Sequence, residues 1–233
     1  MIETDYHVGR ILKFLEEAKI DENTLIVYTS DNGPERSWKS RIADTGHDSR
    51  GGLREGKRSV YEGGHRVPFI VRWPAGIAEA GRSWDGLVGQ TDLLATFADL
   101  VKFKLPDNAG EDSLSFLPVL LDPKSNLQRF PLINKGNDNR YAITEGSWKL
   151  ILPSARHQKP SLFNLANDLS ETKNIAEQHP ERVANLTAKI NQYITSGRST
   201  PGPKQANDTD YWKQLFWMTA EEYEKSRSSP QEN

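Results

Sequence analysis

The chain has 233 residues, a formal net charge of −2 and a hydrophobic content of 36%, so it can form one large domain or two small ones. Its isoelectric point of about 6.2 argues against nucleic acid or a membrane surface as a partner. No apolar stretch approaches the length of a membrane span, and the first residues predict no signal peptide. The sequence contains no cysteine, which excludes disulfides, a cysteine nucleophile and thiolate metal ligands.

The N-terminal region predicts a helix followed by a buried strand. Apolar residues recur at helical spacing between positions 8 and 15. The apolar run at 25–29 does not alternate with polar residues, which suits a strand covered on both faces, as in a parallel sheet. This order is half of a doubly wound α/β unit, in which ligands lie beyond the carboxyl ends of the strands. Asp31 and Asn32 come at that end.

A long segment without periodicity follows, at residues 33–66. Structureless loops longer than about 12–15 residues are uncommon in compact domains. A long loop at the carboxyl end of a strand is a functional candidate by its position alone. We therefore expect this segment to belong to a site.

Three further elements precede a change in composition. Residues 68–73 predict a strand, Thr91-Asp92 can cap a helix, and 114–121 predicts a short apolar helix or turn. The composition changes at 122–126, where we place a subdomain boundary.

Beyond the boundary the pattern predicts a small sheet and one helix. Gly146-Ser147 is typical of a tight hairpin turn between two strands. Pro180 opens an amphipathic helix that Gly197 ends. The tail from residue 199 onward looks irregular, although its aromatic side chains suggest that part of it packs. The strand-like runs cover residues 141–143, 148–152 and 162–165.

Four residues are candidates for the chemistry. Asp31 and Asn32 offer a carboxylate and an amide carbonyl, the ligand types that calcium takes, although an Asp-Asn-Gly turn also occurs commonly without a metal. The ammonium of Lys57 could stabilise charge on an oxyanion, or it could be one solvated lysine among many. His47 could donate to a substrate or carry a proton, and a loop histidine without such a role is an equal alternative.

The segment at residues 61–68 supports the assignment of a site to this region. Gly63 and Gly64 predict positive φ angles or close backbone approach. We expect Glu62 to brace the loop rather than to act as an acid, and Arg66 to be a structural hydrogen-bonding residue.

The ordered set of Ser30-Asp31-Asn32-Gly33, Gly56-Lys57 and Tyr61 to Pro68 resembles the C-terminal half of the sulfatase family, calcium-dependent enzymes with a formylglycine nucleophile. The resemblance covers about residues 3–205. It implies an α/β fold, with a partial alkaline-phosphatase-like sandwich at residues 1–122. A small C-terminal α+β subdomain, with an antiparallel sheet and a helix, would occupy residues 123–198, and an irregular tail 199–233.

The resemblance implies an arylsulfatase-like, calcium-dependent hydrolase of sulfate esters. Asp31 and Asn32 are then calcium ligands, and Lys57 contacts the sulfate. We place Lys57 and His47 as the catalytic and substrate-binding residues. The family's nucleophile motif, Cys-x-Pro-Ser-Arg or a serine equivalent, is absent. Formylglycine is therefore expected in a missing N-terminal half, and we expect the chain to be inactive alone and to expose apolar helix faces.

The implied substrate is a sulfated small molecule or a sulfated glycan. One alternative is a phosphatase or phosphonate hydrolase of the same superfamily, although those enzymes more often have histidine where Asn32 stands and use zinc or manganese. Another is a non-catalytic sulfatase remnant that acts as an interaction module, which the missing cysteine favours. Family members are usually exported, but the compartment of this chain stays open.

Overall fold

The computed structural model of the protein describes residues 2–228. Its strands are β1 Ile26–Thr29, β2 Phe69–Arg72, β3 Leu132–Lys135, β4 Tyr141–Glu145, β5 Trp148–Ile151 and β6 Ser161–Asn164. Its helices are α1 Ile2–Glu17, α2 Trp38–Thr45, α3 Glu62–His65, α4 Asp92–Leu100, α5 Leu117–Leu121, the 3₁₀ turn Ala176–Gln178, α6 Pro180–Ser196 and α7 Ala220–Ser228. None of these helices within residues 2–228 is long and apolar enough to cross a membrane.

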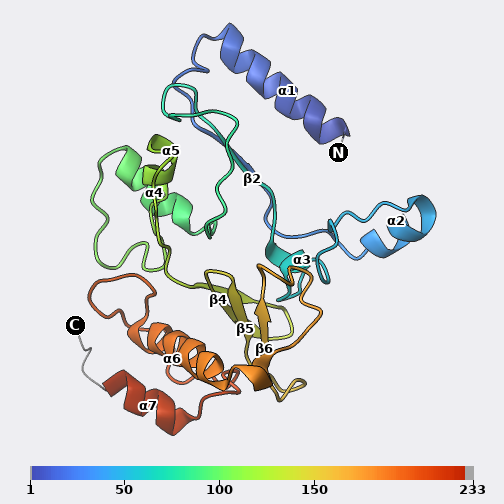
Figure 1. The fold of residues 1–233 in the computed structure, drawn as a ribbon. Helices are drawn as coiled ribbons and strands as arrows, with labels where there is room; N and C mark the ends of the chain where they lie inside the picture. The colour runs from blue at the N-terminus through green and yellow to red at the C-terminus, as the bar shows by residue number, and fades with distance from the viewer. Residues whose placement is uncertain (1, 229–233) are drawn as a thin grey trace.

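The elements form two parts that meet at α3 (Figure 1). One part contains α1, the ribbon of β1 and β2, and the packed pair α4 and α5; the other contains the sheet of β3 to β6 with α6 and α7. The α/β class with an antiparallel C-terminal sheet is the expected one. Helix α1 forms at the predicted place but buries no residue, so its apolar face lies open in the described part of the chain.

Strand β1 pairs differently from the expectation. It lies antiparallel to β2, with Ile26 opposite Arg72 and Thr29 opposite Phe69, and all four of its residues are only half-buried. A parallel, fully covered strand was therefore the wrong prediction for the described residues. The apolar run reflects partial cover of both faces, and it carries no information on the direction of the neighbouring strand.

Two local details of the first part also differ. The segment 33–66 contains α2 and α3 rather than loop alone. Thr91 makes no capping hydrogen bond to α4. The buried carboxylate of Asp92 accepts the Gly89 N–H at 2.8 Å instead, and it forms a two-pronged ion pair with Arg129 at 2.7 and 2.8 Å.

The second sheet has the order β3-β4-β5-β6, and every pair in it is antiparallel. Strands β4, β5 and β6 coincide with the predicted runs. Gly146 takes φ +55° in the turn between β4 and β5, a conformation that glycine adopts without strain. Strand β3 was not predicted from the sequence, because its four residues lie at the sheet edge without a clear alternating pattern.

Both faces of this sheet are covered, because side chains alternate between them. One face packs against Leu186 and Ile190 of α6, and the other against Val60 and Tyr61. The buried sheet residues are Ile143, Leu150 and Leu162 on the first face and Ala142, Ile151 and Phe163 on the second. The segment before α3 is therefore held on the sheet by apolar burial.

Helix α6 begins at Pro180, and Gly197 ends it with φ +68°, as predicted. The tail is not wholly irregular, because it contains α7. The tail packs through Leu215, Met218 and Tyr223. Two of its aromatic residues stay open, Trp212 at 44% and Phe216 at 47% exposure. The subdomain boundaries remain predictions.

Candidate functional site

The site forms where the chain after β1 meets the segment before and within α3. The Gly33 N–H donates to the Gly64 carbonyl at 2.9 Å, and the Lys57 N–H donates to the Pro34 carbonyl at 2.9 Å. A Cβ at Gly64 would lie 2.1 Å from the Ser59 carbonyl oxygen, so only glycine fits. Close backbone approach is therefore confirmed at Gly64, while positive φ is not observed there.

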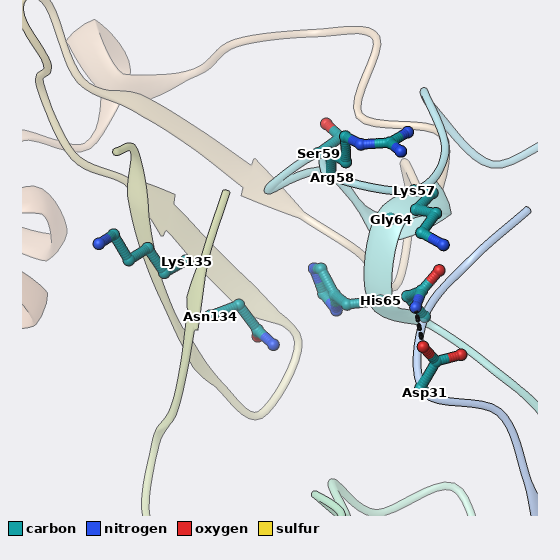
Figure 2. A pocket seen from close by; sticks show the side chains of 9 residues that line it. Asp31, Lys57, Arg58, Ser59, Gly64, His65, Asn134 and Lys135 are labelled. Atoms are coloured by element: carbon teal, nitrogen blue, oxygen red, sulfur yellow. Dashed lines mark hydrogen bonds between the residues drawn. The ribbon is translucent and has the colours of Figure 1, made fainter. Parts of the chain in front are cut away.

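A cavity of about 370 Å³ opens at this junction. In Figure 2 the ammonium of Lys57 is directed toward the side of Asp31, and Asn134 points into the same space from β3. Three cations border it against the single carboxylate of Asp31, which favours an anionic ligand. The cavity is lined by Asp31, Asn32, Lys57, Arg58, Ser59, Gly64, His65, Asn134 and Lys135.

Asp31 and Asn32 are brought together with free oxygen atoms. The Asn32 Nδ2 donates to Asp31 Oδ2, and within residues 2–228 neither Asp31 Oδ1 nor Asn32 Oδ1 takes part in a hydrogen bond. These two oxygens fit part of a calcium shell, which needs six to eight donors. No group of three or more His, Asp or Glu side chains in the described residues could hold a metal, so the pair supplies only a portion of such a shell.

Lys57 keeps its charge available at the cavity. Its Nζ lies 3.9 Å from Glu35 Oε2, a long contact, whereas Arg58 Nη1 lies 2.6 Å from Glu35 Oε1. The hydrogen bond from Arg58, with a second from the Arg36 N–H, lowers the pKa of Glu35 to about 2. Glu35 therefore balances Arg58 first, and its longer contact leaves the charge of Lys57 less fully matched.

His47 lies outside this cavity. It is exposed on the turn after α2, and its backbone N–H donates to Thr45 Oγ1 at 3.3 Å. The neighbouring Asp48 binds Arg50 at 2.9 Å, and within residues 2–228 it makes no hydrogen bond or ion pair with the His47 ring. The structure thus joins Asp31, Asn32 and Lys57 but not His47, whose role stays a prediction.

His65 lines the cavity instead; the sequence placed it within the segment 61–68 but left its role open. Its Nε2 lies 3.1 Å from both the Val60 carbonyl oxygen and the Nζ of Lys149. Burial, and next the charge of Lys149, lower the pKa of His65 to about 4. The imidazole is therefore neutral near pH 7, and it borders the cavity as a hydrogen-bonding group rather than as a cation.

Behind His65 lies a buried cluster of charges. Lys149, fully buried on β5, contacts Oε1 of Glu62 at 2.8 Å and Oε1 of Glu171 at 2.9 Å. Burial acts to raise the pKa of Glu62, but the neighbouring positive groups, Lys149 first among them, outweigh it and lower that pKa; burial raises the pKa of Glu171. Glu62 braces the loop as predicted, and Arg66 binds it through Nε.

Asn134 was also missed by sequence reasoning. It comes from an unpredicted edge strand far along the chain, and only the pairing of β3 with β4 brings it to the cavity. The two apolar residues before it, Leu132 and Ile133, were the only local signal for that strand.

A polar, cation-lined cavity beside two free side-chain oxygens at a strand end is suited to an anionic ligand. Comparison with known proteins makes the class specific. The family model described as Sulfatase matches residues 1–103, and the model described as N-sulphoglucosamine sulphohydrolase, C-terminal, matches residues 55–199. The chain belongs to the sulfatase family.

Individual relatives agree with that assignment. An N-acetylgalactosamine-6-O-sulfatase of Bacteroides thetaiotaomicron is 35% identical over 84% of this chain and 41% of that protein. Human arylsulfatase A is 30% identical over 85% of this chain and 44% of that protein. A solved structure from the metabolism of multiple glycosaminoglycans by Bacteroides thetaiotaomicron is 34% identical, with TM-score 0.73 over 82% of this chain and 43% of that one.

The solved protein Ps i-CgsB, in complex with a neocarrahexaose, is 25% identical, with TM-score 0.69 over 87% of this chain and 43% of that one. The chain thus spans less than half the length of the relatives it matches.

Proposed function

We propose that the protein contributes the C-terminal half of a site that hydrolyses sulfate esters. The observation that carries this proposal is the convergence of Asp31, Asn32 and Lys57 on one cation-lined cavity in a chain of the sulfatase family. The nucleophile would come from an N-terminal half, because the chain contains no cysteine to become formylglycine. Alone, the chain would be inactive.

Each residue has a role that its position supports. Asp31 and Asn32 would hold a calcium ion through their free oxygens, and bound calcium would offset the negative charge of the sulfate. Lys57 would donate to a sulfate oxygen and stabilise the charge that grows there during hydrolysis. His47 would act from its exposed turn only if the substrate reaches beyond the cavity.

The substrate class proposed is a sulfated glycan. A relative that is 35% identical over 84% of this chain is named N-acetylgalactosamine-6-O-sulfatase, and two of the solved relatives concern glycosaminoglycan metabolism and a complex with a neocarrahexaose. The half-buried polar side chains of Asn134 and Ser59 that line the cavity suit sugar hydroxyl groups.

The test joins this chain to the N-terminal half of a sulfatase relative and measures turnover of sulfate and phosphate esters. Lys57→Ala should lose most turnover and Asp31→Ala most calcium affinity, while the exposed-residue controls Lys104→Ala and Asp44→Ala should retain both. Wild-type values in Lys57→Ala and Asp31→Ala would remove these residues from the site. Preference for phosphate esters would favour the phosphatase alternative, and no turnover at all would favour the interaction module.

A further inference from the structure

A second cavity lies next to the candidate site, on the other side of the turn between β3 and β4. Its volume is about 340 Å³. Asn134 and Lys135 border the first cavity, and the residues just after them on the same turn border the second. The second cavity is lined by Asn137, Asp138, Asn139, Ala155, Arg156 and Phe216.

The two cavities share a rigid wall. The Asn137 N–H donates to the Arg58 carbonyl at 3.0 Å, which fixes the turn against the loop that carries Lys57. Because two residues span at most about 7 Å of chain, Lys135 and Asn137 set the two cavities close together. An oligosaccharide of several sugar units is long enough to span the distance between Lys135 and Asn137.

Three polar side chains of the second cavity have no hydrogen-bond or ion-pair partner among residues 2–228. Within residues 2–228, the Arg156 guanidinium takes part in no hydrogen bond or ion pair, and neither do the side-chain amides of Asn137 and Asn139. The charge of Asp138 is balanced by Arg140 at 2.7 Å. The cavity is therefore left with one unmatched positive charge and two unmatched amides.

Aromatic rings complete the surface. Phe216 lines the second cavity with 47% of its surface exposed, and Trp212 is 44% exposed. Lys135, which points away from Asp31 in Figure 2, places its Nζ 4.8 Å from the centre of the Trp212 ring. In residues 2–228 this lysine has no carboxylate partner. Exposed rings beside unmatched cations suit a ligand with apolar faces and negative charges.

We infer that this second cavity is a subsite for a neighbouring sulfated sugar of a glycan chain, with Arg156 binding its sulfate, Asn137 and Asn139 its hydroxyl groups, and Phe216 its ring face. This inference rests on the proposed function only in the choice of a sulfated glycan as the ligand. Lys135 borders the first cavity and contacts the Trp212 ring, and this pair would offer the chain a further charged and aromatic contact. The protein then recognises a polymer rather than a small aryl sulfate.

The test is calorimetric titration of the 233-residue chain with a chondroitin 6-sulfate hexasaccharide and with its desulfated form, at physiological ionic strength. Loss of a charge-assisted contact should weaken binding of the sulfated form by about tenfold in Arg156→Ala, with Arg156→Lys in between. Phe216→Ala should weaken both forms. The matched controls Arg10→Ala and Phe103→Ala, on exposed residues of α1 and of the segment after α4, should bind as the wild type does.

Equal binding of the two hexasaccharides, no binding by the wild type, or equal losses in the control variants would each overturn the inference. Failure of the proposed function would give a different result. The chain joined to an N-terminal half would then show turnover that does not depend on Lys57. A loss of binding in Lys57→Ala without any loss in Arg156→Ala would reject the subsite and leave the hydrolytic site standing.

Discussion

The Nζ of Lys149 lies 2.8 Å from Oε1 of Glu62, although 87 residues separate them along the chain. The contact joins the second strand of the C-terminal hairpin to the short helix that shapes the candidate site. Glu171 shares the same ammonium, so one buried lysine holds two carboxylates and borders His65. The C-terminal sheet therefore does more than pack beside the site: it fixes one of its walls.

Lys149→Met should destabilise the chain strongly. It leaves the buried carboxylates of Glu62 and Glu171 without their shared cation, and breaking a buried ion pair costs about 3–5 kcal/mol. Denaturant unfolding measures the change. The control is Lys159→Met, because Lys159 pairs with Glu177 at the exposed surface, where an ion pair contributes about 0–1 kcal/mol. Similar losses in both variants would refute the role of burial.

Stability should fall on acidification through His65. Its pKa is held down to about 4 by burial and Lys149, while the unfolded chain binds the proton near pH 6.5. The neutral imidazole therefore contributes stability that is fully present above pH 6.5 and is lost as the pH falls toward 4. His65→Gln should flatten the pH dependence of unfolding in that window. An NMR titration showing a His65 pKa near 6.5 would contradict this reading.

Gly64→Ala should disrupt the site loop. The added Cβ would meet the Ser59 carbonyl at 2.1 Å, a backbone atom that cannot rotate away, and overpacking of this kind costs about 1–3 kcal/mol. Gly9→Ala is the control. Gly9 lies within α1 with nothing within 4 Å of the new atom, so alanine should stabilise that helix by about 0.5–1 kcal/mol. Thermal unfolding of the two variants should shift in opposite directions.

The isolated chain should self-associate through α1. Tyr6, Ile11 and Phe14 of this helix expose 63%, 56% and 64% of their surfaces, and contiguous apolar surface of this kind promotes association. Phe14→Glu should lower the sedimentation coefficient at high concentration. Glu16→Gln on the same helix should not, because it leaves the apolar residues in place. A wild-type chain that stays monomeric would contradict the prediction.

Much of the C-terminal part could be predicted because its signals are local. Apolar runs marked β4, β5 and β6, Gly146 marked the turn, and Pro180 and Gly197 marked the ends of α6. Helix α7 gave no such signal, since Tyr223 is its one buried residue among those described. The direction of β1 was also beyond the sequence, because its partner returns only at Phe69.

The site was partly predictable for the same reason. Asp31, Asn32 and Lys57 belong to two segments with recognisable patterns, and the structure brings them to one cavity. Asn134 reaches that cavity through the pairing of β3 with β4, which no spacing in the sequence encodes. His65 lies in the recognised segment 61–68, but its role was left open. His47 was predicted as a site residue because a histidine in a long loop at a strand end can serve in catalysis. In the structure it does not line the cavity.

The ion pair between Asp92 and Arg129 affects what happens when a protease cleaves the chain. It lies almost fully buried, and the exposed segment at 122–126 runs between its two halves. A protease that cuts after Lys124 would therefore sever the backbone without releasing the pieces, since this pair and the Lys149 cluster still clamp them together. Such a nicked protein should run as two bands on a denaturing gel and elute as one particle from a sizing column.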